Sequence, residues 1–325
     1  MQFKLRLRHY LFFFSLISII NQSAGAYPEK SIRLIVPFAT GGSSEIIARS
    51  IANSLTKQLG QAVYVENKPG GAGNIAMEEA KRANPDGYTL ILGHIGTLAA
   101  NPALFGKRLP YDPNKDFIPI TLVAKVPNVI AVSNQSDIKN LKDFIARAKK
   151  NPYAINFGSA GNGSAGHLAM AYFASEADIK LVHVPYKGSG SMMTDLIAGQ
   201  IQATFNGLPS LVGQIKAGTI KPIAIGSLVR SSILPTIPTI SELGFKGFET
   251  SQWYGLLAPA NTPKPIINRL YVEIKEAMKH QDETRRMTED GAILIANTPE
   301  EFARFIKSEQ IRWGRVIHKS QITMD

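Results

Sequence analysis

Two stretches of the chain place glycines and hydroxyl side chains directly before a helical pattern. In "IRLIVPFATGGSSEIIARSIANSLTKQLG", an apolar run from Ile32 passes through Gly41-Gly42-Ser43-Ser44 into residues with helical periodicity. If Gly42 or Ser43 caps this helix, its first backbone N–H groups have no partner within the helix, and together with the helix dipole they favour a carboxylate or phosphate. The alternative is an ordinary strand-to-helix loop with a serine cap.

The second stretch is "FGSAGNGSAGHLAM", residues 157–170. Its glycines from Gly161 onward match the G-x-G-x-x-G spacing of dinucleotide-binding proteins, and a looser match begins at Gly71. That type of site requires an acidic residue at the end of the next strand. The next strand pattern, "KLVHVPYKG", ends in Tyr186-Lys187 instead. We therefore interpret these glycines as a second open helix terminus.

The side-chain groupings of common catalytic sites are not found in the sequence. Neither Ser159 nor Ser164 has the glycine two positions earlier that a nucleophile elbow needs, and no Walker lysine motif occurs. The chain has no cysteine, and its six histidines form no H-x-x-x-H or H-x-H pair. His167, just beyond the glycine loop, is interpreted as a helix-start residue and not as a catalytic base. We predict a binding protein without a metal or cofactor, not an enzyme.

The first 26 residues have the pattern of a secretory signal peptide. Lys4, Arg6 and Arg8 precede the apolar run "YLFFFSLISII", and Ala24-Gly25-Ala26 has the small residues typical of a cleavage site. The alternative is a membrane anchor, but the apolar run is short for a bilayer span. We expect cleavage near Ala26 and a soluble periplasmic protein. Without a cysteine at the cleavage site, lipid attachment there is excluded.

The net charge is strongly positive but dispersed. The chain carries +11, and loss of the three basic residues of the signal peptide, which has no acid, leaves +8. Basic surfaces attract nucleic acids, anionic lipids or anionic solutes. The basic residues form only short clusters such as "AKK" and "TRR". With the export signal, this dispersion argues against a nucleic-acid partner.

The two Gly/Ser stretches lie within a pattern of strands that alternate with helices. Apolar runs at 32–38, 62–67 and 88–93 alternate with helix patterns at 43–59 and 74–84, and a second such series runs from 128 to 227. This alternation predicts an α/β fold of two lobes, each a mostly parallel sheet flanked by helices. Ligands of such sheets bind at the carboxyl ends of the strands.

The C-terminal part of the chain predicts that the first lobe is discontinuous. After "WYGLLAPA", a proline-punctuated link leads to long amphipathic helices with few strands of their own to cover, so they are expected to return to the first lobe. The predicted domains are residues 27–127 plus 252–325 for the first lobe and 128–251 for the second. Two crossings, near 125–128 and near 250, would act as a hinge.

Many longer motifs together resemble the Bug family, the periplasmic solute receptors of tripartite tricarboxylate transporters. The resemblance covers about residues 27–318. The motifs that carry it include "YPEKSIRLIVPFATGG", "GQAVYVENKPGGAGNIA", "PDGYTL", "LPYDPNKDFIPIT", "NFGSAGNGSAGHLA", "VHVPYKG", "TDLIAGQIQATFNGLPS" and "LPTIPTISELGFKGFETSQWYGLLAPANTPKPII".

The resemblance implies a Venus flytrap protein, expected as a monomer, that captures a small carboxylate between its lobes and delivers it to a membrane permease. The carboxylate would be a di- or tricarboxylate or a related organic acid. Open alternatives are a ligand sensor that contacts a membrane partner and an exported cofactor-dependent enzyme. The expected ligand-binding residues are Phe38, Gly41, Gly42, Ser43, Ser44, Thr97, Ser159, Gly161, Asn162, Gly163, Ser164, His167 and Asn206.

Two positions depart from the family pattern. The family commonly has Gly-Gly-Pro-Thr-Asp where this chain has Gly41 to Glu45, which leaves the role of Glu45 open. The family often has an acid at the position of Asn206. An amide donates as well as accepts hydrogen bonds, whereas an ionised acid only accepts them. We predict that Asn206 relaxes any preference for a ligand with an ammonium group.

Overall fold

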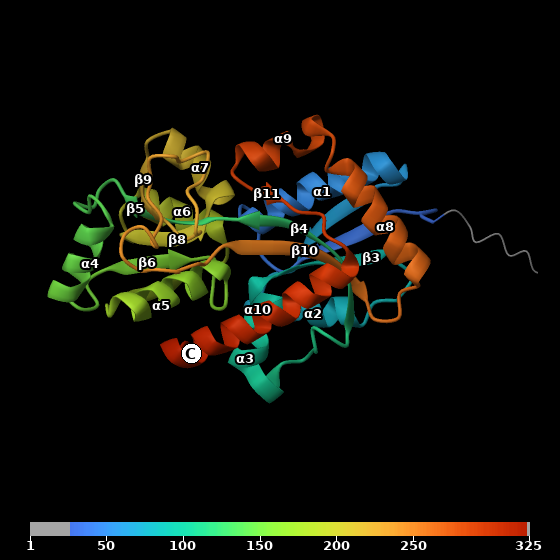
Figure 1. The fold of residues 1–325 in the computed structure, drawn as a ribbon, viewed down its shortest axis with the longest axis horizontal. Coiled ribbons are helices and arrows are strands. Elements are labelled where there is room, and N and C mark those ends of the chain that lie inside the picture. The colour runs from blue at the N-terminus through green and yellow to red at the C-terminus, as the bar shows by residue number, and fades with distance from the viewer. Residues whose placement is uncertain (1–26, 324–325) are drawn as a thin grey trace, which may run out of the picture.

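The computed structural model describes residues 27–323, apart from the side chains of residues 281–283 and 286. The predicted signal peptide, residues 1–26, lies outside the described residues. The chain forms two β-sheets with helices packed around them, and Figure 1 shows the two halves side by side. No helix within residues 27–323 combines the length and apolar character needed to cross a membrane.

The first sheet has six strands in the order β11-β4-β10-β3-β1-β2. Its strands are β1 (Ile32–Val36), β2 (Val63–Asn67), β3 (Thr89–His94), β4 (Phe117–Val126), β10 (Gln252–Pro259) and β11 (Ile293–Leu294). The second sheet has five strands in the order β7-β6-β8-β5-β9. They are β5 (Asn128–Ser133), β6 (Asn156–Ser159), β7 (Val182–Pro185), β8 (Ala203–Gly207) and β9 (Ile220–Ile225).

Most strands of each sheet run in one direction, and the exceptions are the crossing strands β10 and β5 and the short edge strand β11. In the first sheet β1 is parallel to β2 and β3, whereas β10 is antiparallel to both β3 and β4. In the second sheet β6 is parallel to β7 and β8, whereas β5 is antiparallel to β8 and β9. Each crossing strand arrives from the other sheet without a helical crossover, so the βα pattern does not fix its direction. The predicted α/β fold with two sheets is confirmed.

The helices predicted from the sequence are present, within a few residues at their ends, and α3 is a short helix that was not predicted. They are α1 (Ser43–Leu59), α2 (Asn74–Lys81), α3 (Asn101–Phe105), α4 (Leu141–Lys150), α5 (Ala165–Ala177), α6 (Ser189–Ile197), α7 (Leu208–Lys216), α8 (Lys264–Ala277), α9 (Gln281–Glu289) and α10 (Pro299–Ser320). Helix α1 buries Ile47, Ile51 and Leu55 against the first sheet, at the four-residue spacing seen in the sequence.

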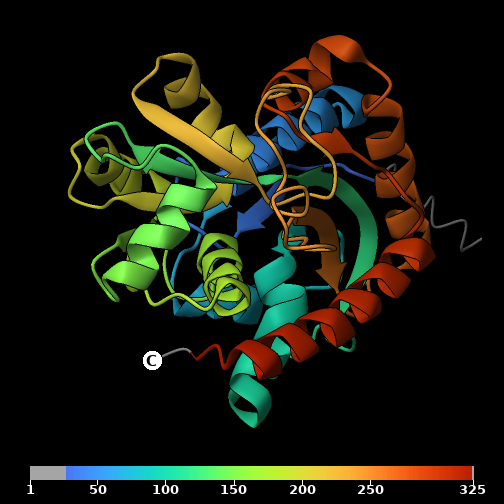
Figure 2. The same cartoon turned by 60° about the vertical axis from the view of Figure 1, so that its left-hand side comes forward.

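The C-terminal helices pack on the first sheet. Phe302, Ile306 and Trp313 of α10 share a buried cluster with Leu122 of β4 and Leu257 of β10. Figure 2 shows α10 crossing this half of the molecule toward the other. At its far end, Lys319 Nζ lies 2.6 Å from Glu176 Oε1 of α5. The last helix therefore contacts elements of both sheets.

Candidate functional site

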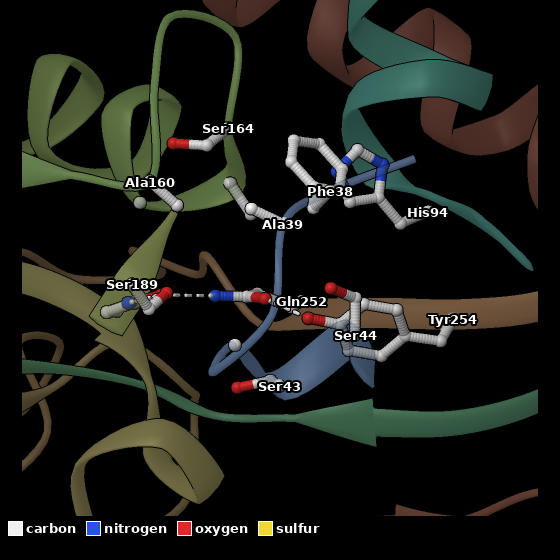
Figure 3. Close-up of a pocket in the computed structure, with 14 residues that line it drawn as sticks. Phe38, Ala39, Ser43, Ser44, His94, Ala160, Ser164, Ser189, Gln252 and Tyr254 are labelled. Carbon is white, nitrogen blue, oxygen red and sulfur yellow. Dashed lines mark hydrogen bonds between the residues drawn. The ribbon is translucent and has the colours of Figure 1, made fainter. Parts of the chain in front are cut away.

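Helices α1 and α5 begin at one cavity between the two sheets. We call it the narrow cavity; its volume is about 30 Å³, room for roughly two water molecules. On the side of the first sheet it is lined by Phe38, Ser43, Ser44, His94, Gln252 and Tyr254. On the side of the second sheet it is lined by Ser164, Ala165, Gly166, Ser189 and Asn206. In Figure 3, Ser164 and Ser189 lie across the cavity from Phe38, His94 and Tyr254.

The first loop, residues 37–42, leads into α1 without a side-chain cap. Gly42 is the N-cap in an extended conformation, and its carbonyl accepts from the N–H groups of Glu45 (3.1 Å) and Ile46 (3.2 Å). The N–H groups of Ser43 and Ser44 have no acceptor among the described residues. Such groups carry the positive end of the helix dipole, so this terminus can receive an anion.

Glu45 turns back toward the first loop. Its Oε2 accepts a hydrogen bond of 2.7 Å from the Gly41 N–H, and its Oε1 lies 2.7 Å from Arg49 Nη2. Glu45 is therefore held by its own helix and by the loop. It does not line the narrow cavity.

The second loop, residues 160–164, leads into α5 and is fixed by its own side chains. Ser164 is the N-cap, and its Oγ accepts from the His167 N–H at 3.4 Å. The Gly163 N–H donates to His167 Nδ1 at 3.2 Å, and the Gly161 N–H donates to Ser159 Oγ at 3.1 Å. The N–H groups of Ala165 and Gly166 remain without an acceptor in the described part of the chain.

Two stacked histidines support the second loop from behind. The rings of His167 and His183 have centroids 4.1 Å apart and are 8° from parallel, and His183 Nε2 lies 2.7 Å from Ser159 Oγ. Burial lowers the pKa of His167 to about 4. Burial, and then the charge of His167, lower the pKa of His183 to about 3. Both rings are therefore neutral at pH 7 and add no positive charge to the site.

A buried chain of polar side chains forms the floor of the narrow cavity. Asn206 Nδ2 donates to Ser189 Oγ at 3.0 Å, and Asn206 Oδ1 accepts from the Gly207 N–H at 2.9 Å. Gln252 Nε2 lies 3.4 Å from Asn206 Oδ1, and the Tyr254 hydroxyl donates to Gln252 Oε1. This chain links β10 of the first sheet to β8 and α6 of the second (Figure 3).

One wall of the narrow cavity is aromatic and adjoins the floor at Tyr254. The rings of Phe38 and His94 have centroids 4.5 Å apart, and those of His94 and Tyr254 are 6.3 Å apart. The Thr97 N–H donates to His94 Nδ1 at 3.1 Å. Thr97 itself is fully buried and supports His94 from behind instead of lining the cavity.

A wide cleft adjoins the narrow cavity and shares Phe38, Ala39 and Ala160 with it. Its volume is about 630 Å³, and it is lined by the glycine-rich residues 69–73, by Phe105, and by residues 185–188. Its charged lining residue is Lys187, which is exposed, whereas no charged side chain lines the narrow cavity. Within residues 27–323, no group of three or more His, Asp or Glu side chains could hold a metal ion.

The structure brings several of the predicted site residues together. Phe38, Gly42, Ser43, Ser44, Ser164 and Asn206 line the narrow cavity, and Gly161 and Asn162 line the wide cleft. Five predicted residues line neither space: Gly41 and Gly163 belong to the two loops, Ser159 and His167 hold the second loop by hydrogen bonds, and Thr97 supports the His94 ring. Whether each of these residues contacts a ligand stays a prediction.

Besides three alanines (Ala39, Ala160 and Ala165), sequence reasoning missed five residues that line the narrow cavity: His94, Gly166, Ser189, Gln252 and Tyr254. Two of them had a local signal, because Gly166 follows the second loop and Ser189 begins a helix after another Gly/Ser stretch. His94 and Tyr254 had none, because they meet only through the antiparallel register of β3 and β10.

Comparison with known proteins gives a consistent result. A family model described as "Tripartite tricarboxylate transporter family receptor" matches residues 47–322. Protein BugT of Bordetella pertussis is 33% identical over 298 residues, covering 92% of this chain and 91% of its own. A solved structure described as a periplasmic transporter superposes with a TM-score of 0.89 at 42% identity, covering 92% of this chain and 100% of its own.

Two further solved structures contain carboxylates. Rpa4515 of R. palustris, solved with adipate, has a TM-score of 0.88 and 33% identity, covering 91% of this chain and 99% of its own. MatC of Rhodopseudomonas palustris, solved with bound malate, has a TM-score of 0.85 and 32% identity, covering 90% of this chain and 100% of its own.

Proposed function

Because the chain belongs to the receptor family of tripartite tricarboxylate transporters, a family of solute-binding proteins and not of enzymes, we propose that it captures a small carboxylate between its two sheets. The proposal covers di- and tricarboxylates and related organic acids. Adipate and malate, found in two solved relatives, both belong to this class. An exported cofactor-dependent enzyme is no longer a competing interpretation, since the family binds solutes.

One observation carries the proposal. Helices α1 and α5, which pack on different sheets, both begin at the narrow cavity, and the first backbone N–H groups of each helix have no acceptor among the described residues. Ser43 and Ser44 supply these donors from α1, and Ala165 and Gly166 supply them from α5. Charge-assisted hydrogen bonds to a carboxylate are about twice as strong as neutral ones. No charged side chain lines the narrow cavity, so amides and hydroxyls would hold the carboxylate.

We propose that the two sheets belong to two lobes that close on the solute. The strands of the first sheet come from residues 32–126 and 252–294 and those of the second from 128–225, in support of lobes 27–127 plus 252–325 and 128–251. A cavity of about 30 Å³ is too small for a dicarboxylate, so the site must widen for entry or the solute must extend into the wide cleft.

Lobe closure can be tested by small-angle scattering of the chain with and without a saturating ligand. A ligand shifts the population toward the closed form only as far as it binds that form better. We expect the radius of gyration to decrease on saturation. An unchanged scattering curve under a proven excess of ligand would contradict lobe closure but not carboxylate binding.

We propose a periplasmic location and delivery of the solute to a membrane permease. Support comes from the signal-peptide pattern of residues 1–26, from the family description and from the relative described as a periplasmic transporter. We expect a monomer that carries no cofactor. Fractionation of cells that express the full chain would test the location, with the mature N-terminus expected close to Tyr27.

The solute preference at Asn206 gives a narrower test. Both polar atoms of its amide are engaged, by Ser189 and by the Gly207 N–H, so the side chain is fixed at the cavity floor. We expect the wild-type chain to bind succinate-like ligands without a preference for aspartate-like ones, and Asn206→Asp to shift the preference toward the ammonium-bearing ligand. An unchanged preference in Asn206→Asp would exclude this role.

The central experiment is a thermal-shift screen of residues 27–325, purified through unfolding and refolding to remove carried-over ligand. The panel comprises mono-, di- and tricarboxylates, acidic amino acids, aromatic acids, nicotinamides and nucleotides. A ligand that binds only the folded state raises the melting temperature by mass action. A shift with one class of carboxylate would support the proposal and identify the solute class. A shift with a dinucleotide alone would refute it.

A further inference from the structure

The imidazole of His94 presents an unused donor at the narrow cavity. His94 ends β3, it is 3% exposed, and it lines the cavity (Figure 3). Its Nδ1 accepts a hydrogen bond of 3.1 Å from the Thr97 N–H. A neutral imidazole that accepts through one nitrogen carries its proton on the other, so we assign the proton to Nε2.

The Nε2–H group of His94 has no acceptor among the described residues. The side chains of Asn101, Thr250, Trp313 and Ser320 also contain buried polar atoms without a partner, but none of these lines the narrow cavity. Buried donors in folded proteins almost always have an acceptor, because an unpaired one destabilises the fold. The unpaired donor at the cavity therefore indicates that an acceptor arrives with the solute.

The ring that carries Nε2 is neutral, and the backbone beside Nε2 carries no side chain. Burial lowers the pKa of His94 to about 4, so the ring is uncharged at pH 7. Phe38 packs against the ring with 4.5 Å between centroids. Next to Nε2, position 96 is a glycine, and a Cβ there would lie 3.2 Å from Nε2 and 2.8 Å from the Gly163 carbonyl oxygen. Any side chain at position 96 would therefore crowd the space between the ring and the second loop.

We propose that His94 is a specificity-determining residue whose Nε2–H donates a hydrogen bond to a hydroxyl or keto oxygen on the solute carbon next to the carboxylate. This inference rests on the proposed carboxylate binding and narrows it to 2-hydroxy and 2-oxo acids. The free N–H groups of α1 and α5 serve the carboxylate oxygens. The neutral Nε2–H of His94, on the aromatic wall, instead suits an uncharged oxygen substituent of the solute. A site built to hydrogen-bond such an oxygen binds an analogue without the oxygen much more weakly.

Matched ligand pairs can isolate this hydrogen bond. Malate and succinate differ by one hydroxyl, and 2-oxoglutarate and glutarate differ by one keto oxygen. We expect calorimetry of the wild-type chain, at pH 7, to show at least about tenfold tighter binding of the oxygen-bearing member in at least one pair. Because the ring is neutral, this preference should stay constant between pH 6 and pH 8.

Two variants separate the roles of the ring nitrogens. In His94→Asn, the amide oxygen can take the place of Nδ1 and accept from the Thr97 N–H, while nothing replaces Nε2. In His94→Gln, the longer side chain can place its NH₂ near the Nε2 position. We expect His94→Asn to abolish the preference within each ligand pair and His94→Gln to retain part of it.

The control variant is Trp313→Phe, which removes another unpaired buried donor, Nε1 on α10, outside the cavity. Because the smaller ring leaves a gap in the buried cluster, the variant should lower the melting temperature, but it should not change the preference. If the wild-type chain binds both members of each pair equally, or if His94→Asn weakens both equally, Nε2 does not read the substituent and the inference is wrong, although carboxylate binding stands. If no carboxylate binds the wild-type chain at all, the proposed function fails, and the inference with it.

Discussion

The first and second loops look alike in sequence but are built differently. Each joins a strand to a helix through glycine and serine, and each leaves two helix N–H groups free at the narrow cavity. The first loop caps α1 with Gly42 and no side chain, so the hydroxyls of Ser43 and Ser44 line the cavity. The second loop uses the Ser164 hydroxyl as a cap and the His167 ring as an acceptor.

Because of this difference, we expect the side chains at the first loop to serve ligand binding and those of the second loop to serve the stability of the fold. In the first loop, the Ser44 hydroxyl is available to a ligand because α1 does not need it as a cap, whereas the Ser43 hydroxyl donates to the Gly207 carbonyl at 3.5 Å. In the second loop, the same groups hold the loop in shape, and mainly backbone N–H groups remain for the ligand. Substitutions in the first loop should therefore change affinity alone, and substitutions in the second should change stability as well.

The largest effect is expected at Gly166, where α5 meets the second sheet. A Cβ at this position would lie 2.6 Å from the Phe205 carbonyl oxygen, which is backbone and cannot turn away. Gly166→Ala should displace the first turn of α5, weaken carboxylate binding at least about a hundredfold, and lower the free energy of unfolding by about 1–3 kcal/mol.

Gly213→Ala in α7 is the matched control for Gly166→Ala. Gly213 is exposed, and a Cβ there would meet no atom within 4 Å. Alanine should stabilise this helix by about 0.5–1 kcal/mol and leave affinity unchanged. Equal effects of the two variants on affinity would show that α5 does not need this close approach.

The next effect concerns pH and the histidines behind the second loop. The folded pKa values of His167 (about 4) and His183 (about 3) lie below the ordinary value of 6.5. The unfolded chain therefore binds more protons between pH 6.5 and about 4, so their contribution to stability is complete above pH 6.5 and is lost as the pH falls. We expect urea unfolding to show a loss of about 1–2 kcal/mol per histidine from pH 7 to pH 5.

The variant His183→Phe tests this origin of the pH dependence. Phenylalanine can stack between Phe157 and His167 as His183 does, but it does not titrate. The variant loses the contact with Ser159, so it should be less stable at pH 7, yet its loss between pH 7 and pH 5 should be smaller than that of the wild-type chain. If the variant and the wild-type chain lose the same stability between pH 7 and pH 5, the loss comes from groups other than His183, and His94 is the next candidate.

Local patterns predicted most of the fold and the two loops that line the narrow cavity. Helix α1 was predicted at 43–59 and occupies Ser43–Leu59, because its apolar spacing and Gly60 at its end are local features. The direction of β10 and the pairing of Tyr254 with His94 were not predictable, because they depend on a chain that crosses between the sheets. The aromatic wall of the cavity was missed for this reason.

Alanine substitutions of a serine beside each loop test the difference between the two loops directly, and their expected effects are smaller than those above. Ser164→Ala removes the cap of α5 and should lower stability by about 1 kcal/mol, as well as affinity. Ser44→Ala removes a cavity hydroxyl that caps nothing and should weaken carboxylate binding by about 1 kcal/mol with little change in stability. Melting temperatures without ligand and calorimetric affinities measure both. Equal losses of stability would remove the distinction between the loops.

The smallest effect is expected at Glu45, whose carboxylate lies on the first loop beside the free N–H groups of α1. It accepts from the Gly41 N–H at 2.7 Å and pairs with the exposed Arg49. Glu45→Gln keeps an acceptor for that N–H but removes a negative charge near the anion site. We expect carboxylate affinity to rise by about 0.3–1 kcal/mol at low salt and the gain to shrink at high salt, because exposed charges are screened. Asp143→Asn, a similar first-turn acid paired with Arg147 on α4, should leave affinity unchanged. If Glu45→Gln weakens binding instead, the carboxylate of Glu45 serves to hold the first loop in its binding shape, and the first loop then depends on a side chain as the second one does.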